Sequence, residues 1–405
     1  MLENIFLIDL LIGGSGSAYG LIDKWRYYIL IAIFFKFFLA GRLRLKSKTV
    51  LYFISAAFSA SLFTLLFNPV YKTSVSALAD YFLFPLLFSF LLLIICSISR
   101  RYIISAYIDI YPLIAQILSF TGLAAVVVSL LHPPSGSIIY NILDSTGEFN
   151  FRLSVFGLTQ STLFVGNLHA IYLISSPVLF FRLKNQSRLP FFVVVIGVLL
   201  TLSVGIFVSF VISTLAALLF GPGSRLGLSE YILCIKIFVL AFVFLSISIY
   251  YFDPVEQFIV NMLDIFLQAF NSVRVFSVAS RLNDIDFFKS QLTIHGFSGF
   301  DVFFGSGFSF YLQNPQISSQ PFIVENSYLV LMTRHGLLGL LTVLIPFLLS
   351  RNPVVVLSML GIYLYSAFSP YLLSVFNISV LWVLFFAGYY TRFYRSGDGR
   401  IRISE

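Results

Sequence analysis

Hydrophobic residues in this chain form long runs that recur from one end to the other, and they do not alternate with polar residues. A helix needs about 20 apolar residues to cross the hydrocarbon core of a bilayer, so these runs predict membrane-spanning helices. A membrane β-barrel would instead show alternating segments of about ten residues. The runs predict about 12 transmembrane helices, at residues 3–19, 27–41, 49–69, 81–99, 103–131, 161–182, 190–204, 206–220, 231–250, 327–349, 353–370 and 374–391.

The composition of the chain agrees with this pattern. The sequence has 405 residues, of which 59% are hydrophobic and only 10% are charged, and 48 are Phe. A soluble protein of this length could not bury so much apolar surface, and we therefore expect lipid to be the main solvent. The sequence predicts an all-α polytopic membrane protein in which residues 1–405 form a single integral membrane domain. The first residues lack the basic start of a cleavable signal peptide.

The basic residues between the predicted helices indicate how the chain is oriented. Segments rich in Lys and Arg stay on the cytoplasmic side of a membrane. Residues 190–220 fit either one long helix or two short ones, and two short crossings place Arg225 on the same side as the other basic segments. The cytoplasmic side would hold both termini, and the outer side would hold two large periplasmic loops, at about 132–160 and 251–326. The other basic residues that indicate the cytoplasmic side are Arg42, Arg44, Lys46, Lys48, Arg100, Arg101, Arg182, Lys184, Arg188, Arg351, Arg392, Arg395, Arg400 and Arg402.

The second outer loop carries its own helical pattern. Asp253, Pro254 and Glu256 match the cap, first turn and third position of a helix start. Apolar residues then recur at helical spacing as far as Val273, which predicts an amphipathic helix lying on the membrane surface or capping the bundle. A second short helix is expected near 284–294.

Charge and cysteine usage narrow the possible functions. The net charge of +8 is explained by cytoplasmic loops that face anionic lipid, and no basic stripe or module indicates nucleic-acid binding. The two cysteines, Cys96 and Cys234, lie inside predicted spans, and the four His residues are scattered. We therefore expect no disulfide framework and no metal site.

Three polar residues stand out around the predicted helix 327–349. Glu325 lies just before its start, and Arg334 and His335 lie about two turns further along the helix. Charge inside an apolar helix is costly unless it is paired or has a function. Arg334 could also form a buried ion pair with Asp109. Lys36 and Lys236 lie within spans as well, and Lys36 is close enough to a helix end to reach water.

Arginines on the outer side add a second candidate feature. Arg152 precedes a predicted span, and Arg274 and Arg281 lie in the second loop. Several guanidinium groups facing one lumen could clamp a pyrophosphate, because they match phosphate oxygens bidentately. Arg152 alone could equally anchor a lipid headgroup. Glu325, at the boundary between water and lipid, could serve as a general base.

A set of short motifs resembles the signature of bacterial O-antigen polymerases (Wzy-type) and the related O-antigen ligases. A Gly-x-Gly turn is followed by a polar pair, a Leu and Gly-Leu-x-Gly, and an upstream segment opens on Arg-x-Ser and closes on Asn. The loop Arg of this superfamily corresponds to Arg281, and Glu325 in place of the His usual in ligases favours a polymerase. The matching residues are Gly305-Ser306-Gly307, Glu325-Asn326, Leu329, Gly336-Leu337-Leu338-Gly339, Arg152-Leu153-Ser154 and Asn167.

The resemblance implies a metal-independent glycosyltransferase of lipopolysaccharide biosynthesis in the bacterial inner membrane, without a cofactor. The donor would be a glycan on undecaprenyl pyrophosphate, the acceptor a lipid-linked repeat unit, and a chain-length regulator a possible protein partner. Glu325, Arg281 and Arg152 would be catalytic. Substrate would be bound by Arg334, His335, Asn326, Arg274, Gly305, Gly307 and Asn167. An O-antigen ligase, a polysaccharide flippase or other transporter, and a scaffold remain as alternatives.

Overall fold

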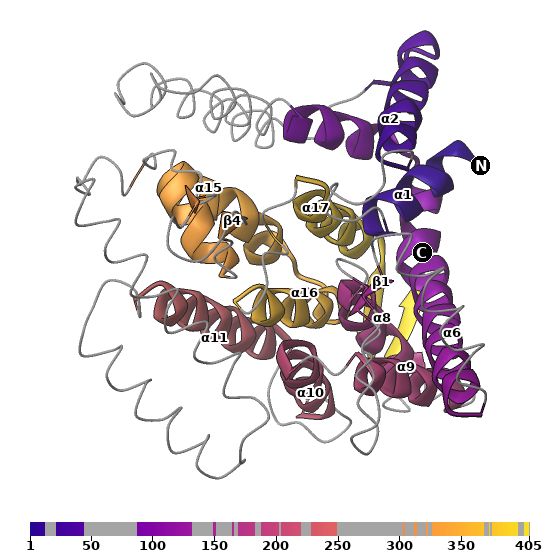
Figure 1. Cartoon of the computed structure of the whole chain (residues 1–405). Coiled ribbons are helices and arrows are strands. Elements are labelled where there is room, and N and C mark those ends of the chain that lie inside the picture. Colours follow the sequence, from indigo (N-terminus) through magenta and orange to yellow (C-terminus); the bar gives the residue numbers. More distant parts are fainter. Residues whose placement is uncertain are drawn as a thin grey trace.

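A computed structural model of the chain is built mainly from helices (Figure 1). It describes residues 1–12, 22–43, 87–131, 149–150, 164–165, 169–182, 188–201, 204–219, 228–248, 303, 312–313, 321–322, 326–367, 372, 375–395 and 401–404. The helices are α1 (Leu2–Ile12), α2 (Ile22–Leu39), an unlabelled helix at Leu87–Ser97, α5 (Arg100–Ser105), the π-helix η2 (Ala106–Ile110), α6 (Tyr111–Leu131), α8 (His169–Arg182), α9 (Leu189–Leu200), α10 (Val204–Leu219), α11 (Leu228–Ser248), α15 (Ser327–Leu349), α16 (Pro353–Ser366) and α17 (Val375–Tyr390).

The helices follow the hydrophobic runs of the sequence. Every predicted span coincides at least in part with a helix, except 49–69, which lies outside the described residues. The ambiguous stretch at 190–220 forms two helices, α9 and α10, which confirms the interpretation as two short elements. The expected helices at 255–273 and 284–294 also lie outside the described residues.

Three short antiparallel ladders accompany the helices, so the expectation of an all-α fold holds only for the bundle itself. They pair β1 (Phe149–Asn150) with β2 (Phe164–Val165), β3 (Leu312–Gln313) with β4 (Pro321–Phe322), and β5 (Arg392–Arg395) with β6 (Ile401–Ser404). The predicted start of a helix at residue 161 is wrong. Residues 164–165 are extended because they pair with residues 149–150, and the helix begins at His169.

The helices fit a helical membrane protein. Among the described residues, Arg100–Ala124 and Ser229–Ser248 are long and apolar enough to cross a membrane, and several other apolar helices are shorter. Large apolar side chains are exposed on the outer helices, such as Phe120 on α6, Phe192 on α9 and Phe244 on α11. In water these surfaces would be unfavourable, whereas lipid tails can cover them.

Helix α16 lies at the centre of the bundle. All of its residues from Pro353 to Ser366 are buried. It packs against α8, α10, α11, α15 and α17, which surround it in Figure 1. Ser358 links α16 to α8 and to η2, because its hydroxyl donates to the Ile174 carbonyl at 2.8 Å and lies 3.0 Å from the Tyr107 hydroxyl.

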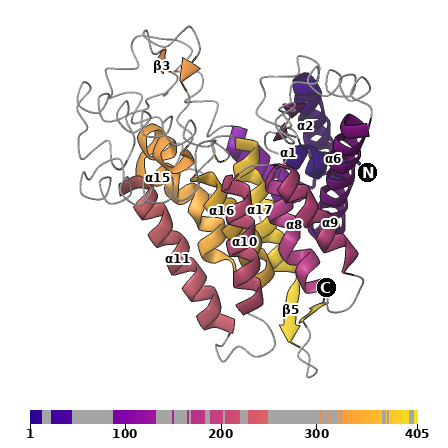
Figure 2. The same ribbon diagram turned by 60° about the horizontal axis from the view of Figure 1, so that its bottom comes forward.

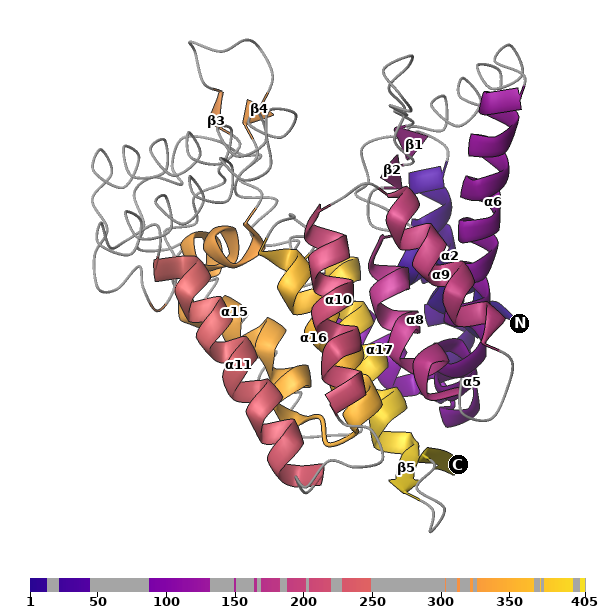
Figure 3. The same ribbon diagram turned by 90° about the horizontal axis from the view of Figure 1, so that it is seen from below.

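The two ends of the bundle differ in what they carry. The β1–β2 and β3–β4 ladders lie at one end, here called the loop end (Figure 3). The β5 strand lies at the opposite end, here called the basic end (Figures 2 and 3). Arg100 also belongs to the basic end, since its Nη2 donates to the Tyr390 carbonyl at 2.8 Å, just before β5. Arg351 precedes Asn352, whose amide binds the Thr391 hydroxyl at 3.1 Å. Arg100, Arg351 and the β5 strand therefore lie at the same end of the bundle.

Candidate functional site: the interrupted helix α15

Helix α15 begins at a strong cap formed by Asn326. The Asn326 Oδ1 accepts hydrogen bonds from the backbone amides of Tyr328 at 3.0 Å and Leu329 at 3.2 Å. Its Nδ2 donates to the Ser246 carbonyl at 3.3 Å, in the last turn of α11. A capping side chain satisfies amides that would otherwise lack partners at a helix start. Asn326 therefore fixes the entry of α15 against α11, immediately after Glu325 in the sequence.

The helix is interrupted at Gly336. This residue has φ +62° and ψ −161°, and it separates two helical segments that meet at a kink. That backbone conformation is essentially restricted to glycine, because a Cβ atom would clash with the adjacent backbone. The change of direction is visible in Figure 3. The sequence pattern predicted one continuous helix over 327–349, and this expectation is wrong at Gly336, directly after Arg334 and His335.

The first half of α15 ends at the buried His335. The segment from Ser327 to His335 has nine residues, which at 1.5 Å per residue corresponds to about 13 Å of helix. His335 is buried at the end of this segment. In membrane proteins, breaks in a helix occur where the backbone is covered by protein or lines a polar cavity.

Gly339 provides the space that His335 occupies. A Cβ atom at position 339 would lie 2.2 Å from the His335 Cβ, far inside van der Waals contact. Because the His335 Cβ is attached to the backbone, it could not move away without shifting the helix. The two glycines of the Gly-Leu-Leu-Gly motif thus have separate physical roles. Gly336 permits the kink, and Gly339 permits the side chain beside it.

Tyr363 of α16 holds both halves of α15. The Tyr328 hydroxyl, from the first half, donates to the Tyr363 carbonyl. The Tyr363 hydroxyl donates to the Val343 carbonyl at 2.6 Å, in the second half. Both tyrosines are fully buried, so these bonds are shielded from water. Tyr363 carries no signal in the sequence, because its role depends on contacts between residues that are distant along the chain.

Further contacts fix the two ends of α15. The Leu372 amide donates to the Ser327 hydroxyl at 3.1 Å, which joins the segment before α17 to the start of the helix. Lys236 of α11 donates to the Leu348 carbonyl at 2.6 Å, close to the end of the helix. A cation at this position compensates carbonyl groups that lack helical partners. The interrupted helix is therefore anchored at its start, across the kink and at its end.

The structure tests only part of the predicted site. Asn326 and His335 are described in full, whereas for Arg334 only the backbone is described. The expected pair of Arg334 with Asp109 stays a prediction, and Asp109 itself is exposed in the π-helix η2. The other candidates lie outside the described residues, namely Glu325, Arg152, Arg274, Arg281, Gly305, Gly307 and Asn167.

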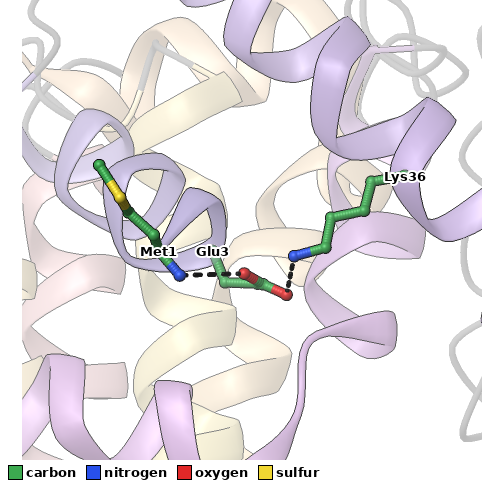
Figure 4. Close-up of polar contacts among 3 residues, drawn as sticks. All are labelled: Met1, Glu3 and Lys36. Carbon is green, nitrogen blue, oxygen red and sulfur yellow. Dashed lines mark hydrogen bonds and ion pairs between the residues drawn. The ribbon is translucent and has the colours of Figure 1, made fainter.

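The buried carboxylate of Glu3 lies away from α15, in helix α1. Lys36 was expected to extend towards water, and 43% of its side chain is exposed, while its Nζ donates to the Glu3 Oε1 at 2.6 Å (Figure 4). The Glu3 Oε2 lies 3.7 Å from the Met1 amino group. Only 6% of Glu3 is exposed, and it therefore requires a cationic partner. This ion pair joins α1 to α2 and has a structural role. Within the described part of the chain, no cluster of His, Cys, Asp and Glu could hold a metal ion.

Comparison with protein-family models, with curated proteins and with solved structures found no match to this chain. The resemblance to O-antigen polymerases therefore stays a prediction that rests on the motifs themselves.

Proposed function

We propose that this chain is a membrane glycosyltransferase of the O-antigen polymerase type, which lengthens a glycan carried on undecaprenyl pyrophosphate. The observation that carries the proposal is the interruption of α15 at Gly336, next to Arg334 and His335. Interrupted helices in membrane proteins commonly frame sites for polar or charged ligands, because the freed backbone groups need partners there. In this chain the interruption falls within the motif that resembles the polymerases.

The proposed placement has the chain in the bacterial inner membrane, with about 12 transmembrane helices. The loop end faces the periplasm with the two large loops, and the basic end faces the cytoplasm with both termini. The convergence of Arg100, Arg351 and the β5 strand at one end supports this orientation, because basic segments stay on the cytoplasmic side. The start of α15 then lies at the periplasmic side, where a lipid-linked sugar would be presented.

The proposed reaction joins two lipid-linked substrates. A hydroxyl of the acceptor repeat unit attacks the anomeric carbon of the donor glycan, and the bond from that carbon to the pyrophosphate oxygen breaks. Undecaprenyl pyrophosphate leaves with the electron pair, while Glu325 accepts the proton of the attacking hydroxyl. Arg152, Arg281 and Arg334 stabilise the charge that develops on the pyrophosphate. Arg274, Gly305, Gly307 and Asn167 complete the substrate site.

The described contacts support a positioning function for Asn326 within this scheme. Three hydrogen bonds tie its side chain to the backbones of α15 and α11. The residue before it, Glu325, is thus attached to a fixed point of the bundle. A general base must lie within hydrogen-bond reach of its proton, so a rigid attachment favours catalysis. His335, seated beside Gly339, would contact the substrate from the kink.

The proposal can be tested in a strain that lacks this gene. Its surface polysaccharide is separated on a gel with the wild-type gene or a variant restored. Wild type should convert a single repeat on the core into a ladder. Glu325→Gln and Arg281→Ala should lose the ladder at equal membrane abundance. Glu230→Gln and Arg351→Ala serve as matched controls and should keep it, because both residues are exposed outside the proposed site.

The same gel separates the competing functions. Loss of all capped core, with finished polymer left on undecaprenyl pyrophosphate, would indicate a ligase. Lipid-linked repeats retained on the cytoplasmic face would indicate a flippase. A full ladder from both Glu325→Gln and Arg281→Ala would exclude the catalytic roles given to these residues.

A further inference from the structure

The β5–β6 ladder emerges from the basic end at a fixed position. Only Thr391 separates α17 from β5. The Asn352 amide binds the Thr391 hydroxyl at 3.1 Å and its carbonyl at 3.2 Å. Arg100 donates to the Tyr390 carbonyl at 2.8 Å, and its guanidinium lies 5.9 Å from the centre of the Tyr390 ring. The bundle therefore holds both residues that lead into the ladder.

The register of the ladder separates its residues into two unlike faces. Residues that are paired across strands share a face, and successive residues along a strand alternate between faces. The basic face consists of Arg392, Tyr394, Arg402 and Ser404. The other face, here called the apolar face, consists of Phe393, Arg395, Ile401 and Ile403. Two arginines and a tyrosine thus share one side of a two-stranded ladder, while three of the four residues on the other side are apolar.

We propose that the basic face binds the anionic phospholipid headgroups of the membrane that surrounds the bundle. The ladder follows α17 after a single residue, and Tyr389 before it is 76% exposed, as is typical of aromatic residues at a membrane interface. Arg100 and Arg351 lie at the same end. Anionic lipids of the cytoplasmic leaflet are the nearest polyanionic surface, and they attract basic segments next to a membrane helix.

This inference rests on the proposed membrane placement and is independent of the catalytic assignment. Each arginine near an anionic membrane surface strengthens binding by about fivefold, so loss of both should weaken the attachment by roughly 25-fold. The attraction between exposed charges is screened by salt. The expected behaviour is therefore a ladder protected by anionic lipid at low ionic strength and released by salt.

The test uses the full-length protein in lipid nanodiscs. Phosphatidylglycerol replaces phosphatidylcholine stepwise, and hydrogen–deuterium exchange of the amides of 392–404 is measured. In wild type, exchange should slow as phosphatidylglycerol increases. Arg392→Gln/Arg402→Gln should lose this response. Arg395→Gln removes one charge from the apolar face and should keep the response, whereas the single variants Arg392→Gln and Arg402→Gln, which also remove one charge each, should weaken it.

Two controls keep the outcome decisive. Exchange in α17 should be equal in all variants, which shows that the bundle is intact. The sugar ladder should also form in the Arg392→Gln/Arg402→Gln variant, so a failure of the lipid inference is separable from a failure of the proposed function. Equal exchange in both lipids, or equal loss of the response in Arg395→Gln, would overturn the proposal.

Discussion

Replacing Gly336 by Ala tests the interruption of α15 most directly. At φ +62° and ψ −161°, an alanine costs about 1–3 kcal/mol if the backbone keeps its conformation. If the backbone relaxes towards a continuous helix, the second half turns relative to the first. The bonds from Tyr328 to Tyr363 and from Tyr363 to Val343 cannot then both survive, and each buried bond lost costs about 1–3 kcal/mol. Gly336→Ala should destabilise the protein by either route.

Gly41 provides the matched control for backbone strain. Its φ of +59° resembles that of Gly336, but nothing lies within 4 Å of a Cβ built on it. Gly41→Ala should therefore lower the free energy of unfolding by about 1–2 kcal/mol and leave α15 unchanged. Gly339→Ala should act differently, because the new methyl group displaces His335. Overpacking of this kind costs about 1–3 kcal/mol and moves the motif residue itself.

Two measurements separate these effects. Thermal unfolding of the purified variants in one detergent reports the loss of stability, and the sugar ladder in the deletion strain reports the proposed activity. We expect Gly336→Ala and Gly41→Ala to lose comparable stability, while only Gly336→Ala and Gly339→Ala shorten or abolish the ladder. The reasoning is refuted if Gly336→Ala unfolds at the wild-type temperature and yields a wild-type ladder.

Two further predictions concern the partly buried lysines Lys36 and Lys236. Lys36→Met should destabilise the bundle by about 1–3 kcal/mol, because it removes the cation that is hydrogen-bonded to the buried Glu3 and leaves only the more distant Met1 amino group, while the lysine itself is partly exposed. Glu3→Gln/Lys36→Met should recover much of the loss in a thermal double-mutant cycle, and full additivity would contradict the pairing. Lys236→Met should cost about 1.5–3 kcal/mol by removing the bond to the Leu348 carbonyl. Cys234→Ser, at an exposed position on the same helix, should unfold like wild type, and equal stability of Lys236→Met would exclude the anchoring role.

The starts of the last three helices could be predicted from sequence almost to the residue, whereas the predicted end of α16 at residue 370 is four residues too late. Asn326 and Asn352 cap α15 and α16, and apolar runs follow both directly, so hydropathy and capping indicate the same boundaries. The kink at Gly336 could not be predicted in this way. A glycine in an apolar run is compatible with a straight helix, and hydropathy does not depend on φ.

Pairings between residues far apart along the chain could likewise not be predicted from the sequence. Phe164 and Val165 belong to an apolar run that reads as helix, yet they pair with residues 149–150. Lys36 bonds to Glu3, which is 33 residues away. Within the candidate site, the motif indicated Asn326, Arg334 and His335. The bridging role of Tyr363 depends on three-dimensional contacts that no local pattern encodes.

The complete burial of α16 has a consequence for how the protein is made. In the finished bundle this helix meets protein on every side, so it has no permanent contact with lipid. Its partners α8, α10 and α11 precede it in the chain and leave the ribosome first. In the proposed membrane placement, lipid tails cover the inner faces of those helices until Pro353–Ser366 is inserted. Insertion of α16 then replaces these lipid contacts by contacts with protein, so the bundle closes only near the end of synthesis. The bonds between Tyr363 and the two halves of α15 form at that stage.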